Sequence, residues 1–210
     1  MGEERRFGWQ AAEMNGTQTT SSDEEPGWAL RNIVEKEPSA TPVAALTAPP
    51  APFGWTDGLT DSEGPRFWDR VVAVEQARNA RHKRTGTIVL FEVVGFEDVV
   101  QRWGTTLALQ LFVELSRVLS RGNRESDHLA RIAPTRFAVL LTETDEIRAI
   151  NYVDRIKEAC QRELDPATNG LRVVVGWASP EVGRTLAEAY SVAESRLGDA
   201  LRREALEHQA

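Results

Sequence analysis

Two side chains in the middle of the chain have types and a spacing suited to binding a ligand. Arg124 and Asp127 form the pattern R-x-x-D, a planar cation followed three positions later by an anion. An arginine can donate two hydrogen bonds to O6 and N7 of a guanine, and a carboxylate can accept from the N–H edge of that base. A second interpretation stays open: Arg124 complements the C-terminus of a preceding helix, and Asp127 opens a strand.

Other residue types that could do chemistry lack supporting partners. Glu92 ends an apolar run, where a carboxylate faces solvent or a basic neighbour. His82, His128 and His208 have no metal-ligand spacing, and no phosphate-binding loop or nucleophile elbow occurs in the sequence. Cys160 is the only cysteine, so we expect a small buried hydrophobe in a reducing cytoplasm. We therefore expect no metal and no cofactor.

Charge and hydropathy exclude several classes of protein. The net charge of −7 predicts no general attraction to nucleic acid or to an anionic membrane. The sequence contains no run of about 18 apolar residues and no apolar signal-peptide segment, so we expect no membrane insertion.

The composition predicts two parts, a tail over residues 1–56 and a folded domain over 57–210. The tail holds six of the ten prolines and carries a net charge of −4, so it should be disordered. Trp9, Trp28 and Trp55 are spaced along it as candidate anchors for a protein partner or for folding back onto the domain. Incidental aromatic residues in a linker are the alternative.

Periodicity and turn signals predict alternating helices and strands in the folded part. The expected elements of the first half are a helix from Pro65 to about Arg84, a strand Thr87–Val94, a short helix that ends at Trp103 and a longer helix Thr106–Arg121. Those of the second half are a hairpin of His128–Ala133 and Phe137–Leu141, a helix Asp145–Leu164, a loop Asp165–Gly170, a strand Leu171–Ala178 and a helix Thr185–Gln209. This order predicts an α/β sandwich with a mixed central sheet flanked by helices.

The apolar spacing also predicts which side of each helix is buried. In the first helix the predicted stripe contains Phe67, Val71, Val74 and Arg78. In the helix that follows the hairpin it contains Ile147, Ile150, Val153 and Ile156.

The hairpin and its flanks resemble the GGDEF domain, the diguanylate cyclase family. The frame R-x-S-D-x-L-A-R over Arg124–Arg131, followed by F-A-V-L-L from Phe137, is similar to the signature hairpin of that family. Asp57-Gly-Leu-Thr-Asp61 resembles the family's D-x-L-T motif, and Leu171–Ala178 resembles its S-I-G-V-A strand. The resemblance covers about residues 57–200 and implies a palm-like α/β fold.

The same resemblance implies that the usual chemistry is lost. The five positions of the Gly-Gly-Asp/Glu-Glu-Phe turn are here Ala133, Pro134, Thr135, Arg136 and Phe137. The family's two metal ligands map to Glu92 and Thr135, and its catalytic glutamate maps to Arg136, which repels a cation. Proline has no N–H to offer a phosphate.

Base recognition is also expected to be absent. The family's guanine-reading asparagine and aspartate fall on Val100 and Leu109, the second aspartate of its strand-end motif falls on Val94, and its phosphate-binding lysine falls near Leu197. An unpaired buried donor on the base costs roughly 1–3 kcal/mol.

Arg124 and Asp127 lie where the family's inhibitory site binds cyclic di-GMP. We therefore interpret the chain as a catalytically inactive GGDEF-like protein of bacterial cyclic di-GMP signalling that acts as an effector through this pair. The first alternative is a nucleotide-independent interaction or scaffold module, which could also form a homodimer. The second is a residual metal-dependent nucleotidyl cyclase centred on Glu92.

Overall fold

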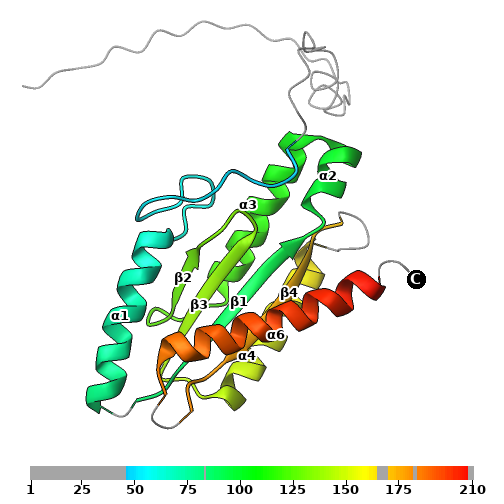
Figure 1. The fold of residues 1–210 in the computed structure, drawn as a ribbon. Helices are drawn as coiled ribbons and strands as arrows, with labels where there is room; N and C mark the ends of the chain where they lie inside the picture. Colours follow the sequence, from blue (N-terminus) through cyan, green and yellow to red (C-terminus); the bar gives the residue numbers. More distant parts are fainter. Residues whose placement is uncertain (1–45, 83, 165–169, 182–183, 208–210) are drawn as a thin grey trace, which may run out of the picture. The chain divides into compact units, whose positions relative to one another are not determined.

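The computed structural model describes residues 46–82, 84–164, 170–181 and 184–207. The tail positions Trp9 and Trp28, most of the loop Asp165–Gly170 and His208 lie outside the described residues. The elements are α1 (Pro65–His82), β1 (Gly86–Val94), α2 (Phe96–Trp103), α3 (Thr105–Arg121), β2 (His128–Arg131), β3 (Arg136–Thr142), α4 (Glu146–Leu164), β4 (Arg172–Ala178) and α6 (Leu186–Glu207). The predicted element order is confirmed (Figure 1).

The four strands form one sheet in the order β2-β3-β1-β4, and every neighbouring pair is antiparallel. The predicted mixed sheet is therefore wrong. The helical crossover α2–α3 does make β2 parallel to β1, but β3 returns from the hairpin and lies between them. β1 likewise separates β3 from β4, so no parallel pair becomes adjacent.

Helices cover both faces of this sheet, with α1 and α6 on one face and α3 and α4 on the other (Figure 1). β1 supplies Val89, Phe91 and Val93 to the core beside α3 and α4, and Ile88 and Leu90 to the core beneath α1 and α6. All five side chains are buried. The continuous apolar run of β1 thus marks a central strand buried on both faces, as its sequence predicts.

A glycine lets α6 approach the sheet closely. A Cβ atom on Gly176 of β4 would lie 2.3 Å from the carbonyl oxygen of Ala193 and 2.4 Å from the amide nitrogen of Leu197. Any larger residue would push α6 away from β4.

Two of the predicted helix stripes are displaced. In α1 the buried residues are Trp68, Val71 and Glu75, whereas Val74 is 38% exposed. In α4, Val153 and Ile156 are buried as predicted. Ile147 is 76% exposed there, because the buried side of the first turns runs through Ala149 and Tyr152.

The segment before α1 closes one edge of the sheet. Thr56 and Glu63 form an antiparallel bridge, and Glu63 pairs in turn with Ala130 of β2. The amide of Arg131 donates to the carbonyl oxygen of Glu63 at 2.8 Å. The loop 54–64 therefore covers part of the edge of β2 through one isolated parallel bridge.

None of the helices in the described ranges has both the length and the hydropathy needed to cross a membrane.

Candidate functional site

The turn between β2 and β3 is tightly held. The amide of Ile132 donates to the carbonyl oxygen of Arg136 at 2.9 Å, and Ala133 and Arg136 exchange two longer hydrogen bonds. Phe137, the one signature residue that is kept, is fully buried with its ring 5.6 Å from that of Phe112. The turn is thus anchored in the core by Phe137, although its four half-buried residues differ from those of the family signature.

Glu92 at the end of β1 already has two partners from this turn. Arg136 Nε donates to Glu92 Oε2 at 2.7 Å, and the Thr135 hydroxyl donates to Glu92 Oε1. Arg136 Nη1 also reaches Glu194 of α6 at 3.2 Å. Burial would lower the pKa of Arg136, but its hydrogen bond to Glu92 and the surrounding negative charge outweigh burial and raise it.

The GGDEF resemblance implies divalent cations at this position, and the residues present do not fit them. A magnesium ion needs several free oxygen ligands, whereas both oxygens of Glu92 are hydrogen-bonded and a guanidinium occupies the adjacent space. Within the residues that the structure describes, no group of three or more His, Cys, Asp or Glu side chains could hold a metal ion.

The other positions mapped to the active site are apolar and packed. Val100 is 6% exposed within the core beside α3, and Leu109 packs partly buried against the same core. Val94 packs against the core under α6. Leu197 is 1% exposed and lies against Gly176, so it offers no side chain to a phosphate, whereas Glu194 of α6 reaches the turn.

A buried ion pair holds the turn in place, and no pattern in the sequence predicted it. Arg131 Nη1 lies 3.0 and 2.9 Å from the two carboxylate oxygens of Asp57. Its Nε and Nη2 both donate to the carbonyl oxygen of Pro134, and its guanidinium lies 5.0 Å from the Phe112 ring centroid. Arg131 is fully buried.

The partners of Asp57 set its charge. Burial would raise its pKa, but hydrogen bonds from Thr60 and Arg131 and the arginine charge outweigh burial and hold the pKa below its ordinary value. Asp57 and Thr60 belong to the D-x-L-T motif and Arg131 to the hairpin frame. The signal that could have paired them was a charged residue of opposite sign in each of the two motifs.

Arg124 and Asp127 lie together at the opposite end of β3 from Glu92. They line a cavity of about 310 Å³ with Leu141, Thr144, Arg148, Asn151, Tyr152 and Arg155. Asp127 also has a structural role, because its carboxylate accepts hydrogen bonds from the amides of Arg124 at 3.0 Å and Thr142 at 3.2 Å. Asp127 thus opens β2, as the second interpretation predicts, while it also faces the cavity.

The helix-capping role considered for Arg124 belongs to another arginine. Arg155 Nη2 donates to the carbonyl oxygen of Gly122 at 2.8 Å, at the C-terminus of α3. The Arg124 side chain is exposed and makes no ion pair with another described residue. Arg148, Asn151 and Arg155 belong to α4. They were not predicted as residues of this cavity, because no sequence pattern links them to Arg124.

Trp55, the third predicted anchor for a partner, is 56% exposed. Phe53 beside it is 84% exposed. Cys160 is 6% exposed, so the prediction of a buried hydrophobe is confirmed.

Comparison with curated proteins finds diguanylate cyclases. The chain is 29% identical over 124 residues to "Probable diguanylate cyclase DgcC" of Escherichia coli, which covers 58% of this chain and 33% of that protein. It is 26% identical over 94 residues to "Diguanylate cyclase DosC" of Escherichia coli, covering 43% of this chain and 20% of that protein. The chain thus spans about a third or less of the length of these relatives.

Solved structures share the fold. The diguanylate cyclase SiaD of Pseudomonas aeruginosa, in complex with its activator SiaC, superposes with a TM-score of 0.63 at 23% identity, over 70% of this chain and 58% of that one. The GGDEF domain of DgcB from Caulobacter crescentus, in complex with c-di-GMP, gives 0.65 at 18% identity, over 71% and 91%. The model of the family "Diguanylate cyclase, GGDEF domain" matches residues 54–205, most of the chain, and the chain therefore belongs to the GGDEF family.

Proposed function

We propose that this protein is a catalytically inactive member of the GGDEF family that binds cyclic di-GMP in the cavity of Arg124 and Asp127. It acts as a cytoplasmic effector. Binding of the dinucleotide changes which partners the protein contacts.

The observation that carries the proposal is the donor set of the Arg124 cavity. Arg124, Arg148 and Arg155 supply guanidinium donors for a guanine edge or a phosphate, and Asp127 supplies the acceptor. A cavity of about 310 Å³ suits one base, so the rest of the ligand would lie over the exposed arginines at its rim.

The loss of catalysis is supported at three separate places. Arg136 pairs with the carboxylate on which a metal would depend, Pro134 offers no N–H to a phosphate, and Val100 is buried where a base would need a polar partner. No single substitution accounts for all three differences, which favours an active site that has lost its function.

DgcB provides the analogy for the ligand, since its GGDEF domain was solved in complex with c-di-GMP. DgcB shares only the fold with this chain, so the ligand assignment depends on the residues of the cavity.

Calorimetric titration of the full chain and its Arg124→Ala variant tests the site. The wild-type protein should bind cyclic di-GMP with micromolar affinity, and the variant should lose at least about tenfold, since it removes a charge-assisted bidentate contact. Arg117→Ala is the matched control, because Arg117 is an exposed arginine of α3 whose ion pair among the described residues is with Glu114. Equal affinities for the wild type and Arg124→Ala would reject the site.

A nucleotide-independent interaction module is the second candidate. It is favoured by Phe53 and Trp55, which are 84% and 56% exposed. The loop that carries them is held by backbone hydrogen bonds from Arg66 to Gly54 and from Gly64 to Trp55. Exposed aromatic side chains on a fixed loop suit a partner protein or a second copy of the chain.

SiaD, which is complexed with its activator, offers a parallel for a protein partner. This candidate predicts that the protein does not bind cyclic di-GMP and that Phe53→Ala/Trp55→Ala abolishes capture of the partner protein.

A further inference from the structure

A groove of about 780 Å³ lies between α1 and α6, on the face of the sheet that α3 and α4 do not cover (Figure 1). The two helices meet at one end, where the amide of Leu186 donates to Oε1 of Gln76, and they diverge toward the hairpin. Ile132, which directly follows β2, lines the groove from the side of the sheet. The volume lies in the range of sites that bind small molecules.

Most of the lining is apolar. Trp68 and Val72 contribute from α1 and Tyr190 from α6, with the small residues Ala73 and Ala187 beside them. Trp68 is 7% exposed and belongs to the core beneath these helices, so this wall is fixed in place. Aromatic and aliphatic walls of this kind favour a ligand with an apolar body.

The charge of the groove is negative. Among the described residues that line it, Asp69 is the one charged side chain. Asp69 is exposed, and its carboxylate has no ion pair or hydrogen bond with another described residue. A carboxylate that has no cationic partner favours a ligand with a positive charge.

Tyr190 lies across the groove from Asp69. Burial raises the pKa of Tyr190, and the charges of Glu194 and Asp69 add to this effect, while Arg136 opposes it. The Asp69 carboxylate on α1 thus acts on the phenol of α6. An ammonium group placed between them would have a carboxylate on one helix and an aromatic ring on the other.

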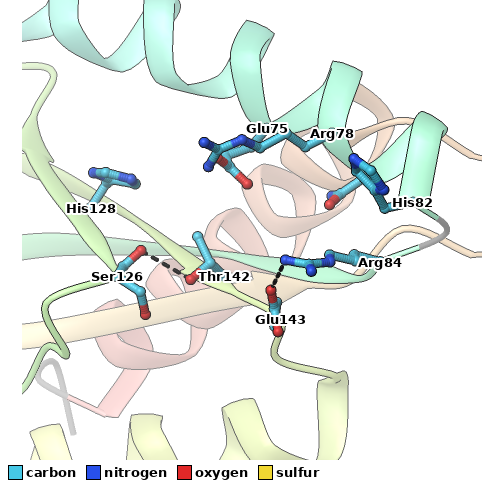
Figure 2. Close-up of a pocket in the computed structure, with 9 residues that line it drawn as sticks. Glu75, Arg78, His82, Arg84, Ser126, His128, Thr142 and Glu143 are labelled. Carbon is cyan, nitrogen blue, oxygen red and sulfur yellow. Dashed lines mark hydrogen bonds and ion pairs between the residues drawn. The ribbon is translucent and has the colours of Figure 1, made fainter.

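The cavity at the C-terminal end of α1 differs in charge. Figure 2 shows Arg78, His82 and Arg84 around that cavity, with Arg84 paired to Glu143. The groove at the N-terminal half of α1 has no lysine, arginine or histidine among the described residues that line it. Anionic ligands are therefore disfavoured in the groove, since no cationic side chain faces them there.

We propose that the groove between α1 and α6 binds a small apolar amine, with the ammonium group paired to Asp69 and the apolar body against Trp68 and Tyr190. The groove shares no lining residue with the Arg124 cavity, so this site does not depend on cyclic di-GMP binding or on the absence of catalysis.

Calorimetric titration of the full chain with tryptamine, tryptophol and indole-3-acetate tests the proposal. The three compounds share an indole ring and carry a positive, a neutral and a negative side chain at neutral pH. Tryptamine should bind with submillimolar affinity, tryptophol should bind about fivefold more weakly, and indole-3-acetate should give no heat.

The variant Asp69→Asn tests the charge pairing. It should weaken tryptamine binding about fivefold and leave tryptophol binding unchanged, because only the amine loses an ionic partner. Asp154→Asn is the matched control, since Asp154 is an exposed aspartate of α4, on the other face of the sheet.

The variant Ala73→Phe tests the location of the site. Ala73 is exposed and lines the groove, so a phenyl ring there should fill the groove without disturbing the core and should abolish tryptamine binding. Ala77→Phe is the matched control. Ala77 is also exposed, one turn further along α1, and does not line the groove.

Four results would overturn the proposal. These are no binding of tryptamine, equal affinities for the three compounds, and unchanged tryptamine binding in Asp69→Asn or in Ala73→Phe. Equal affinities would assign the groove to an apolar segment of a protein. Arg124→Ala should weaken cyclic di-GMP binding and leave tryptamine binding intact, so a failure of one site is distinguishable from a failure of the other.

Discussion

Arg136 and Glu92 lie directly opposite each other on the neighbouring strands β3 and β1, and their side chains form an ion pair with 2.7 Å between Nε and Oε2. The arginine thus brings a fixed positive charge to the carboxylate that a divalent cation would otherwise need. Opposite charges at facing positions of an antiparallel pair also stabilise the strand pairing.

Restoring the signature turn alone should not restore synthesis of cyclic di-GMP. The test variant combines Ala133→Gly, Pro134→Gly, Thr135→Asp and Arg136→Glu. Val100 and Leu109 still offer no hydrogen bonds to a guanine, so GTP should remain unconverted in the presence of magnesium. Chromatography of the nucleotides after incubation measures this, and any cyclic di-GMP above the wild-type background contradicts it.

Replacing Arg131 with methionine should strongly destabilise the fold. The change leaves the Asp57 carboxylate buried without its cation and the Pro134 carbonyl without two donors. The expected loss in the free energy of unfolding is about 3–5 kcal/mol, measured by urea denaturation. Arg202→Met is the matched control, because the Arg202–Asp199 pair is exposed and should contribute less than about 1 kcal/mol. Equal losses in the two variants would show that the buried ion pair contributes no more to the free energy of unfolding than the exposed pair.

Glu63 should make stability fall as pH rises. Burial raises the pKa of Glu63 to about 7. In an unfolded chain a glutamate titrates near ~4.3, so between these values the folded state holds a proton that the unfolded state has lost. The free energy of unfolding should therefore decrease through this window and level off above the folded-state pKa.

The variant Glu63→Gln isolates this effect. Urea denaturation at a series of pH values from about 5 to 8 should show a smaller decrease in stability for Glu63→Gln than for the wild type. Glu125→Gln, at an exposed position, should keep the wild-type slope. A Glu63→Gln profile parallel to the wild type would assign the pH dependence to other groups.

Cys160 should be unreactive in the folded protein. Burial, with a smaller contribution from the charge of Glu163, raises the pKa of its thiol to about 11, so little thiolate forms at pH 8. A colorimetric disulfide reagent should therefore react slowly without denaturant and rapidly in concentrated urea. Fast reaction in native buffer would mean that α4 opens readily or that the thiol is accessible.

Local patterns were sufficient to predict the elements because they act within a few residues. Pro65 begins α1, Gly122 follows α3 and Pro134 lies in the hairpin turn, all as their chemistry predicts. The sheet order was not accessible in this way. Whether β3 or β2 lies beside β1 depends on how the hairpin inserts after the crossover, and hydrophobic periodicity is the same in both cases.

The candidate site was predictable only where its residues are close in sequence. Arg124 and Asp127 are three positions apart, and the structure places both on one cavity. Asp57 and Arg131 are separated by 74 residues and meet through folding alone. The predicted buried stripe of α4 was wrong in its first turns for a related reason: Ile147 and Ile150 fit an apolar repeat, although Ala149 and Tyr152 are the buried residues there.

We expect this protein to bind cyclic di-GMP without making it. The most direct measurement is calorimetric titration of the full chain with cyclic di-GMP and, in parallel, with GTP and magnesium. Cyclic di-GMP should bind with micromolar affinity, and GTP should give no heat. GTP binding with turnover, or no response to cyclic di-GMP, would contradict this expectation.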